Sequence, residues 1–529
     1  MTDAAQRFPL ILAGVAASAC LGFAAYTGHT WEDYFITFRS SLNLASGNGL
    51  VYQPGERVHT FTSPLGTLLP ALFAAGGGEH VAVRALWWFR LLSAAAAGGA
   101  VWLAARTLVR DGLAPVAVGA ACAMWAFDPK MVDFAINGME SALLVLFVVI
   151  AWWALTHRAA PWPIALGFAG LQWTRPDGVV FFAALAAAGA FFGAGAPGGN
   201  GNRRWPALVR GVGLGLALYL PWVICASVYY GSPIPHTVQA KISHHPPGEL
   251  APALLLYPWR LLFGHTALHD VFQPAYSFFG GWPAVLAWTS RLVAVGAALA
   301  WLLPSVRSAG RVASAAFFLG GFYVEYIPRS PWYYPAWQVL ACLAWAFLFD
   351  AAAQRGNLRR PARIAAGMLV GLQVALLLGV AWQMKAQQSL IEDGHRTKLG
   401  QWLRVHAAPN DRVYLEPLGY IGFFSGLKML DHPGLASPEV VAARRAGART
   451  HAQVVAALRP EWLVLRPDQA GQIRAENPPL LERDYGLARQ FDVRADIDSI
   501  RFLPGRGYLE FDAVFLVYRR AMAPPLSRE

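Results

Sequence analysis

Residues 30–65, TWEDYFITFRSSLNLASGNGLVYQPGERVHTFTSPL, decide how the rest of the chain is interpreted. They follow directly on an apolar run, LILAGVAASACLGFAAY at residues 10–26, which is typical of a membrane-spanning helix. Two adjacent acids, Glu32 and Asp33, therefore stand where the chain leaves a candidate span. Ionisable groups at membrane depth are costly and are usually paired or functional. We therefore expect these two acids to lie at or near a functional site.

The composition agrees with a membrane protein. Of 529 residues, 56% are hydrophobic and 14% charged, whereas a soluble domain carries roughly a quarter charged residues. Apolar runs of about twenty residues recur along most of the chain. We predict a polytopic α-helical membrane protein with about eleven transmembrane helices, at 8–27, 84–105, 113–128, 139–156, 162–173, 178–195, 207–229, 281–303, 312–327, 335–353 and 363–384.

The chain changes character after residue 384. Residues 385–529 mix charged helical patterns with short apolar strands, RVYLEP, EWLVLRP and AVFLVYR, which indicates a small α/β domain. We therefore predict two parts. Residues 1–384 form the transmembrane catalytic domain, with the outer loop 28–83 carrying the Glu-Asp pair, and residues 385–529 form a periplasmic α/β domain.

The formal net charge of +12 would suggest a nucleic-acid partner in a soluble protein. Here the arginines fall in alternate short connections, which is the bias of cytoplasmic loops; they include Arg106, Arg158, Arg204, Arg307 and Arg359. This bias places the N-terminus in the cytoplasm and the C-terminal domain outside it, and we expect no nucleic acid as a partner. The first apolar run has features of a signal peptide, but we expect it to be retained as a helix.

Four motifs on the predicted outer face resemble one family. They are EDYFITFR with the following GNGLVYQPGERV and TSPL, then GMES at 138–141, TRPDG at 174–178, and YYGSPIPHTVQAK ending at Lys241. This pattern is similar to the GT-C membrane glycosyltransferases, and in particular to mycobacterial-type terminal arabinofuranosyltransferases that use decaprenyl-phosphate arabinofuranose. The resemblance implies a GT-C-like fold in a bacterial inner membrane.

The resemblance also implies a reaction. A sugar, arabinofuranose in these relatives, is transferred with inversion from a decaprenyl- or undecaprenyl-phosphate carrier to a polysaccharide or glycoprotein outside the cytoplasm. Asp33 matches the catalytic base, which takes the proton of the acceptor hydroxyl. Glu32 is expected to orient Asp33, to bind a sugar hydroxyl or to share a divalent ion. One Glu-Asp dipeptide supplies few metal ligands, so we expect no required metal or other cofactor.

The remaining candidate residues follow from the same outer face. The lipid phosphate needs cations, and we expect Lys241, Arg329 and Arg39 to supply them, although Arg39 also suits an ion pair with a neighbouring acid. Candidates for sugar or acceptor binding are Tyr34, His59, His236, Glu140, Trp332 and Tyr333. The aromatic members are equally suited to anchoring at the membrane interface, and Glu140 to a structural role at a helix N-terminus.

Two rival classes share some of these features. A transporter or flippase for a lipid-linked sugar typically binds its substrate at the bilayer midplane between internal repeats. In this chain the charges gather at one face and no repeat is visible. A polysaccharide ligase or polymerase uses the same kind of donor and stays open as an alternative. We expect the protein to function as a monomer in the lipid bilayer.

Overall fold

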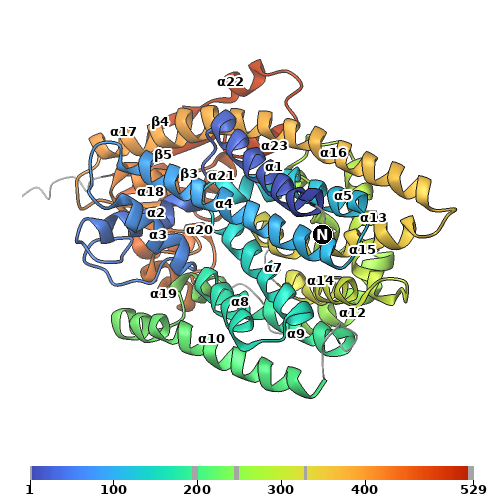
Figure 1. Cartoon of the computed structure of the whole chain (residues 1–529). Helices are drawn as coiled ribbons and strands as arrows, with labels where there is room; N and C mark the ends of the chain where they lie inside the picture. The colour runs from blue at the N-terminus through green and yellow to red at the C-terminus, as the bar shows by residue number, and fades with distance from the viewer. Residues whose placement is uncertain (1–2, 194–200, 243–249, 327–329, 522–529) are drawn as a thin grey trace, which may run out of the picture.

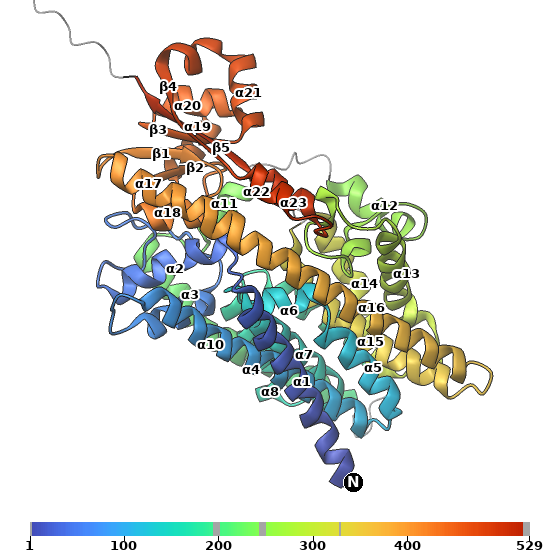
Figure 2. The same cartoon turned by 90° about the horizontal axis from the view of Figure 1, so that it is seen from above.

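A computed structural model describes residues 3–193, 201–242, 250–326 and 330–521. It consists of a long helical bundle with an α/β domain at one end (Figure 1, Figure 2). Figure 2 shows the N-terminus at the tip of α1 (Asp3–Thr27), at the end of the bundle remote from the α/β domain. The predicted combination of membrane-type helices and a C-terminal α/β domain is therefore present.

The bundle is built from helices of very different length. They are α1, α2 (Glu32–Ala45), α3 (Pro64–Ala74), α4 (Val81–Arg110), α5 (Pro115–Ala126), α6 (Pro129–Ile136), α7 (Ser141–His157), α8 (Pro161–Thr174), α9 (Gly178–Phe192), α10 (Gly201–Tyr230), α11 (His236–Ile242), α12 (Leu250–Phe263), α13 (Val285–Leu299), α14 (Ser308–Tyr326), α15 (Pro335–Ala353) and α16 (Arg359–Ala386). Short 3-10 turns lie at Ala267–Asp270, Ser277–Phe279, Ala300–Leu302 and Pro331–Tyr333.

Within the described residues, six helices are long and apolar enough to cross a membrane, or seven if the bent pair α6 and α7 forms one span. The two members of that pair meet at 114°. Several other apolar helices, such as α5 and α9, have 10–17 residues. A multi-pass membrane protein is thus confirmed, while the predicted count of about eleven spans is not.

Connections that the sequence predicts to lie on the same side of the membrane contact one another. At one end, Arg307 forms an ion pair with Asp350 at 3.3 Å, and His157 contacts Asp111 at 2.9 Å. Arg307 also donates to the backbone carbonyl of Asp111, which ties three predicted cytoplasmic connections together. The predicted outer loops meet at the other end, beside the α/β domain. Which end faces the cytoplasm remains a prediction.

One helical rod joins the two parts. α16 continues through a π-helix (η6, Gln387–Thr397) into α17 (Lys398–His406), so helix runs without a break for 48 residues across the predicted domain boundary. π-helical turns are rare and often mark functional positions. Here the wide turn buries Glu392 and Arg396 against the α/β domain.

The C-terminal domain is a three-layer structure around a mixed five-stranded sheet of order β2-β1-β3-β5-β4. The strands are β1 (Arg412–Leu415), β2 (Lys428–Asp431), β3 (Trp462–Leu465), β4 (Tyr485–Asp492) and β5 (Val514–Arg520). β1 runs parallel to β2 and β3, whereas β5 is antiparallel to β3 and β4. The three predicted strands are β1, β3 and β5; β2 and β4 were not predicted.

Helices cover both faces of the sheet. Alternate side chains of a strand point to opposite faces, so Val413 and Leu415 pack with α17 and α18 (Gly419–Ser425), whereas Tyr414 packs on the other side. That second face is covered by α19 (Pro438–Arg445), α20 (His451–Leu458) and α21 (Pro467–Glu476); the π-helical Leu480–Asp484, α22 (Arg494–Ser499) and α23 (Arg506–Phe511) complete the domain. Ile36 and Tyr52, from the segment between α1 and α3, join the first core, so the sheet is docked on the helical bundle.

Candidate active site

Glu32 and Asp33 occupy the first turn of α2, directly after the turn that leaves α1. Acidic side chains are favourable at a helix N-terminus because the backbone N–H groups there carry partial positive charge. Both acids are half-buried. Glu32 also accepts a hydrogen bond from the backbone N–H of Gly419 in α18, so the C-terminal domain contacts the acidic pair directly.

The turn before the acids is held in place by several buried partners. Arg90 donates to the backbone carbonyls of Gly28 at 3.0 Å and His29 at 2.6 Å. The His29 ring contacts the Asp133 carboxylate at 2.8 Å, and both side chains are buried. The Thr30 N–H donates to the Gln388 side chain at 3.0 Å. Such supporting contacts fix the position of the two acids that follow.

In the described part of the chain, three cationic side chains act electrostatically on the acidic pair. Burial raises the pKa of both carboxyls, because the charged form loses hydration. Lys241 of α11 opposes this rise most strongly at Asp33, followed by Arg175 and Arg396. At Glu32 the strongest opposing charge is Arg396. Asp33 is thus a carboxyl with raised proton affinity that lies among positive charges.

Two of these cations already have acidic partners. Arg175 contacts Glu140 at 3.1 Å and Asp177 at 2.9 Å, and its guanidinium lies 4.6 Å above the Tyr333 ring. Arg396 pairs with Glu392 at 2.9 Å and with Asp512. For Lys241 no ion pair or hydrogen bond is present within the described part of the chain, and its side chain is half-buried. Among the residues that the structure describes, Lys241 is therefore a cation that acts on Asp33 and is available to an incoming anion.

Arg39 has a different environment. Its guanidinium donates to the backbone carbonyls of Gly422 at 2.8 Å and Leu427 at 3.1 Å and to the Gln53 side chain at 2.9 Å, and it lies 4.4 Å above the Tyr52 ring. Gly422 and Leu427 belong to the end of α18 and the residues after it. The Arg39 donors are therefore engaged in docking the C-terminal domain.

The predicted sugar-binding residues fall into two groups. Glu140 and Tyr333 lie around Arg175, and Trp332 packs 5.9 Å from Trp31, next to the acids. His236 begins α11, and its backbone N–H donates to the His59 carbonyl at 2.8 Å. Arg329, which the sequence predicted to bind the lipid phosphate, lies outside the described residues.

Tyr34 and His59 are core residues. Tyr34 is 1% exposed and stacks on Phe38. A Cβ at Gly138, which has a φ of +99°, would come within 2.5 Å of the Tyr34 ring, so the glycine of the GMES motif allows this packing. His59 is buried and stacks on Tyr230 at 4.6 Å, and burial lowers its pKa to about 4.

The structure also brings in residues that the sequence did not single out. Gly419 lies 387 residues from Glu32 in the chain, and Arg396 reaches the same pair from the π-helical turn. Nothing local in either segment predicts this contact. Tyr276, whose ring stacks on Trp31 beside the acids at 5.3 Å, was not predicted either, although its loop QPAYSFFGGW at 273–282 is rich in aromatic residues.

No group of three or more His, Cys, Asp or Glu side chains that could hold a metal ion occurs among residues 3–193, 201–242, 250–326 and 330–521. Glu32 and Asp33 therefore have no third ligand of these types in that part of the chain. The donors that approach the pair are backbone N–H groups and cationic side chains, which suit an anionic or hydroxylic substrate.

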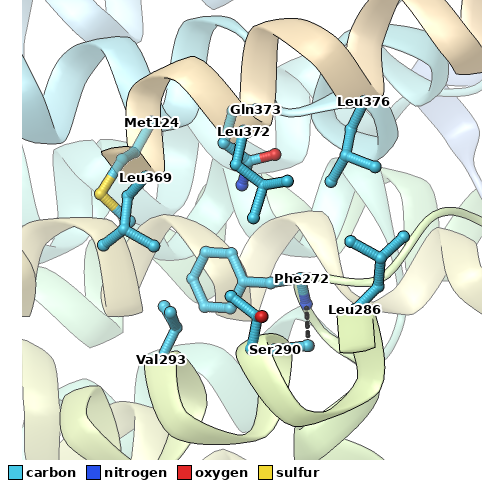
Figure 3. A pocket seen from close by; sticks show the side chains of 10 residues that line it. Met124, Phe272, Leu286, Ser290, Val293, Leu369, Leu372, Gln373 and Leu376 are labelled. Carbon is cyan, nitrogen blue, oxygen red and sulfur yellow. Dashed lines mark hydrogen bonds between the residues drawn. The ribbon is translucent and has the colours of Figure 1, made fainter. Parts of the chain in front are cut away.

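A narrow crevice lies between α13 and α16 (Figure 3). Leucine side chains from both helices surround it, and Phe272 donates its backbone N–H to the Ser290 hydroxyl at 3.1 Å. Its volume of about 20 Å³ is close to the space that one water molecule occupies. This crevice is too small for a sugar.

Comparisons with known proteins agree with the motifs. Residues 382–514 match a family described as a domain of unknown function, DUF8728. A terminal beta-(1->2)-arabinofuranosyltransferase of Corynebacterium glutamicum is 28% identical over 263 residues, which are 44% of this chain and 37% of the relative. The Mycobacterium tuberculosis protein of the same name is 30% identical over 189 residues, 34% of this chain and 28% of the relative. The matched part thus spans well under half the length of either relative.

The overall fold has a counterpart among solved structures. The chain superposes on ArnT from Cupriavidus metallidurans bound to undecaprenyl phosphate with a TM-score of 0.50 and 13% identity, covering 96% of this chain and 97% of that one. At this identity the likeness shows the fold. Together these likenesses confirm the predicted resemblance to GT-C membrane glycosyltransferases and to terminal arabinofuranosyltransferases.

Proposed function

We propose that the protein is an inverting membrane glycosyltransferase that moves a sugar from a polyprenyl phosphate to a glycan or protein acceptor outside the cytoplasm. The observation that carries the proposal is the placement of Asp33. It is half-buried at the end of the first span and lies beside Lys241, a cation available to an anion. A base and a phosphate-binding cation are the two groups that this reaction requires.

The transfer follows from these two groups. The acceptor hydroxyl gives its proton to the Asp33 carboxylate as its oxygen attacks the anomeric carbon of the donor. The bond from that carbon to the phosphate oxygen breaks on the opposite side, and polyprenyl phosphate leaves with the electron pair. Lys241 stabilises the charge of the leaving phosphate. Arg175, held by Glu140 and Asp177, adds positive potential around Asp33.

Glu32 and Arg39 receive supporting roles. Glu32 accepts a hydrogen bond from the Gly419 N–H, Arg396 is the charge that acts on it most strongly, and its hydrogen bond to the adjacent Asp33 lowers the pKa of that base. Arg39 holds α18 in place through its carbonyl contacts, so we assign it to domain docking and not to phosphate binding.

Arabinofuranose is the sugar that we propose, because the two curated relatives are named as arabinofuranosyltransferases. The proposal is tested by incubating the purified protein in detergent with polyprenyl phosphates that carry arabinofuranose, mannose or aminoarabinose. We expect release of polyprenyl phosphate from the arabinofuranose carrier. Release from the mannose or aminoarabinose carrier alone would contradict the sugar, and release from none would contradict the enzyme class.

A further inference from the structure

A second cavity lies next to the acidic pair and has no role in the steps above. Its volume is about 420 Å³, within the range of roughly 300–1,000 Å³ that is typical of small-molecule sites. Its walls come from α6, the loop between α12 and α13, and the segment before α15. The walls carry both polar and aromatic side chains, among them Lys130, Asp270, Gln273, Tyr276, Phe278 and Tyr334.

Tyr276 forms the wall between this cavity and the acids. Its backbone has a φ of 57°, in the left-handed region that residues with side chains seldom adopt. Its ring stacks between Trp31 at 5.3 Å and Tyr508 of the C-terminal domain at 4.4 Å, nearly parallel to both. Trp31 directly precedes Glu32, and both Glu32 and Asp33 act electrostatically on the Tyr276 hydroxyl. The cavity therefore begins one aromatic ring away from the acidic pair.

The charges of the cavity disfavour a phosphate. The ammonium of Lys130 donates to the backbone carbonyls of Asp270 at 2.8 Å and Val271 at 3.1 Å and lies 4.4 Å from the Tyr334 ring centre. The Asp270 carboxylate faces the same space and contacts Gln273 at 2.7 Å and His265 at 3.2 Å. The Asp270 carboxylate would repel an anion in this cavity, whereas Lys241 near Asp33 would attract one.

The same walls suit a neutral sugar. The Phe278 ring is 68% exposed, and an aromatic ring packs against the apolar face of another group. Asp270 and Gln273 provide an acceptor and an amide for hydroxyl groups. Because Tyr276 separates the cavity from Asp33, the occupant is the part of a saccharide next to the reacting unit, not the reacting hydroxyl itself.

The geometry points to a subsite for a neutral saccharide, the sugar of the acceptor glycan that adjoins the unit to be modified. This inference rests on the proposed function, because it assigns the cavity to the acceptor of that reaction. The C-terminal domain takes part in the subsite, since Tyr508 of α23 supports the Tyr276 ring.

The test uses the full-length protein in detergent and a fluorescent arabinofuranose oligosaccharide, with binding followed by fluorescence polarisation without donor. Phe278→Ala and Gln273→Ala remove an aromatic face and an amide of the cavity. Combined, they are expected to weaken saccharide binding roughly tenfold or more. Binding of unglycosylated polyprenyl phosphate is expected to stay within about twofold of the wild type.

Phe263→Ala is the matched control, because Phe263 is 66% exposed, similar to the 68% of Phe278, packs on Trp259 and does not line the cavity. It should leave saccharide affinity unchanged. The inference would be overturned if the double variant kept its saccharide affinity, or if it lost polyprenyl phosphate binding instead. It would also be overturned if the wild type bound no saccharide. Failure of the wild type to release polyprenyl phosphate from the sugar carriers would contradict the proposed function instead, and that measurement is separate.

Discussion

At the scale of single residues, the electrostatic influence of Lys241 on Asp33 predicts a specific pH dependence. Asp33 accepts a proton only when ionised, and burial raises its pKa above the usual value of about 3.9. Turnover is therefore expected to fall as the pH drops through this raised pKa, at a higher pH than for an exposed aspartate. Because Lys241 lowers the pKa of Asp33, Lys241→Ala should move this acid limb to still higher pH. The measurement is kcat/KM for the donor against pH.

Lys241→Arg is the control for that prediction, since it keeps the positive charge and should leave the acid limb near its wild-type position. If the acid limb does not move in Lys241→Ala, or moves to lower pH, then Lys241 does not lower the pKa of the base. Donor affinity should also weaken in the alanine variant, because a cation that faces the phosphate is removed.

At the scale of elements, α18 is expected to fix the position of Glu32. A Cβ at Gly419 would come within 2.0 Å of the Glu32 backbone oxygen, so Gly419→Ala must displace α18 from α2. A displacement of about 1 Å near an active site can cost as much as about 100-fold in rate. We expect turnover of Gly419→Ala to fall at least tenfold on this ground. Gly471→Ala, in α21 of the same domain, has nothing within 4 Å of the added carbon and should keep wild-type turnover.

A thermal melt accompanies both glycine variants, so that a loss of folding is told apart from a shift of α18. If Gly419→Ala folds and turns over like the wild type, the contact between Gly419 and Glu32 does not position the acid.

The same elements show what the sequence could and could not predict. The apolar strands β1, β3 and β5 were recognised because their side chains are buried on both faces, whereas β4, with most of its side chains exposed, lacks that signal. Glu32 and Asp33 were found from a local motif. The contact with Gly419, and the use of Arg39 donors on α18 carbonyls, depend on how two distant segments pack, which no local pattern encodes.

At the scale of the whole molecule, the two ends of the bundle are expected to face opposite sides of the membrane. The connections with excess arginine gather at one end and the acidic pair lies at the other, near the α/β domain. A reporter enzyme fused after residue 384 should be active outside the cytoplasm, and one fused after residue 200 should be active inside. Opposite results at both sites would invert the topology, and the acids would then face the cytoplasm.

The number of spans was harder to predict than their presence. Apolar runs identify membrane helices by length, but the predicted spans at 113–128, 162–173 and 178–195 correspond to α5, α8 and α9, which have 12, 14 and 15 residues. Runs such as α5 and α9 pack inside the bundle and are shorter than a usual span. The composition shows that these segments are apolar, but what they contact depends on how the whole bundle packs.

The central claim is that Asp33 is the base of a transfer from a lipid-linked sugar, and one comparison tests it most directly. Product formation and binding of a non-hydrolysable donor analogue are measured side by side for the wild type and Asp33→Asn, which keeps the size of the side chain but removes its proton affinity. Loss of a general base typically lowers the rate by about 10²–10⁴, so turnover should collapse by this factor while analogue binding is retained. Sugar transfer by Asp33→Asn at a near wild-type rate would contradict the account.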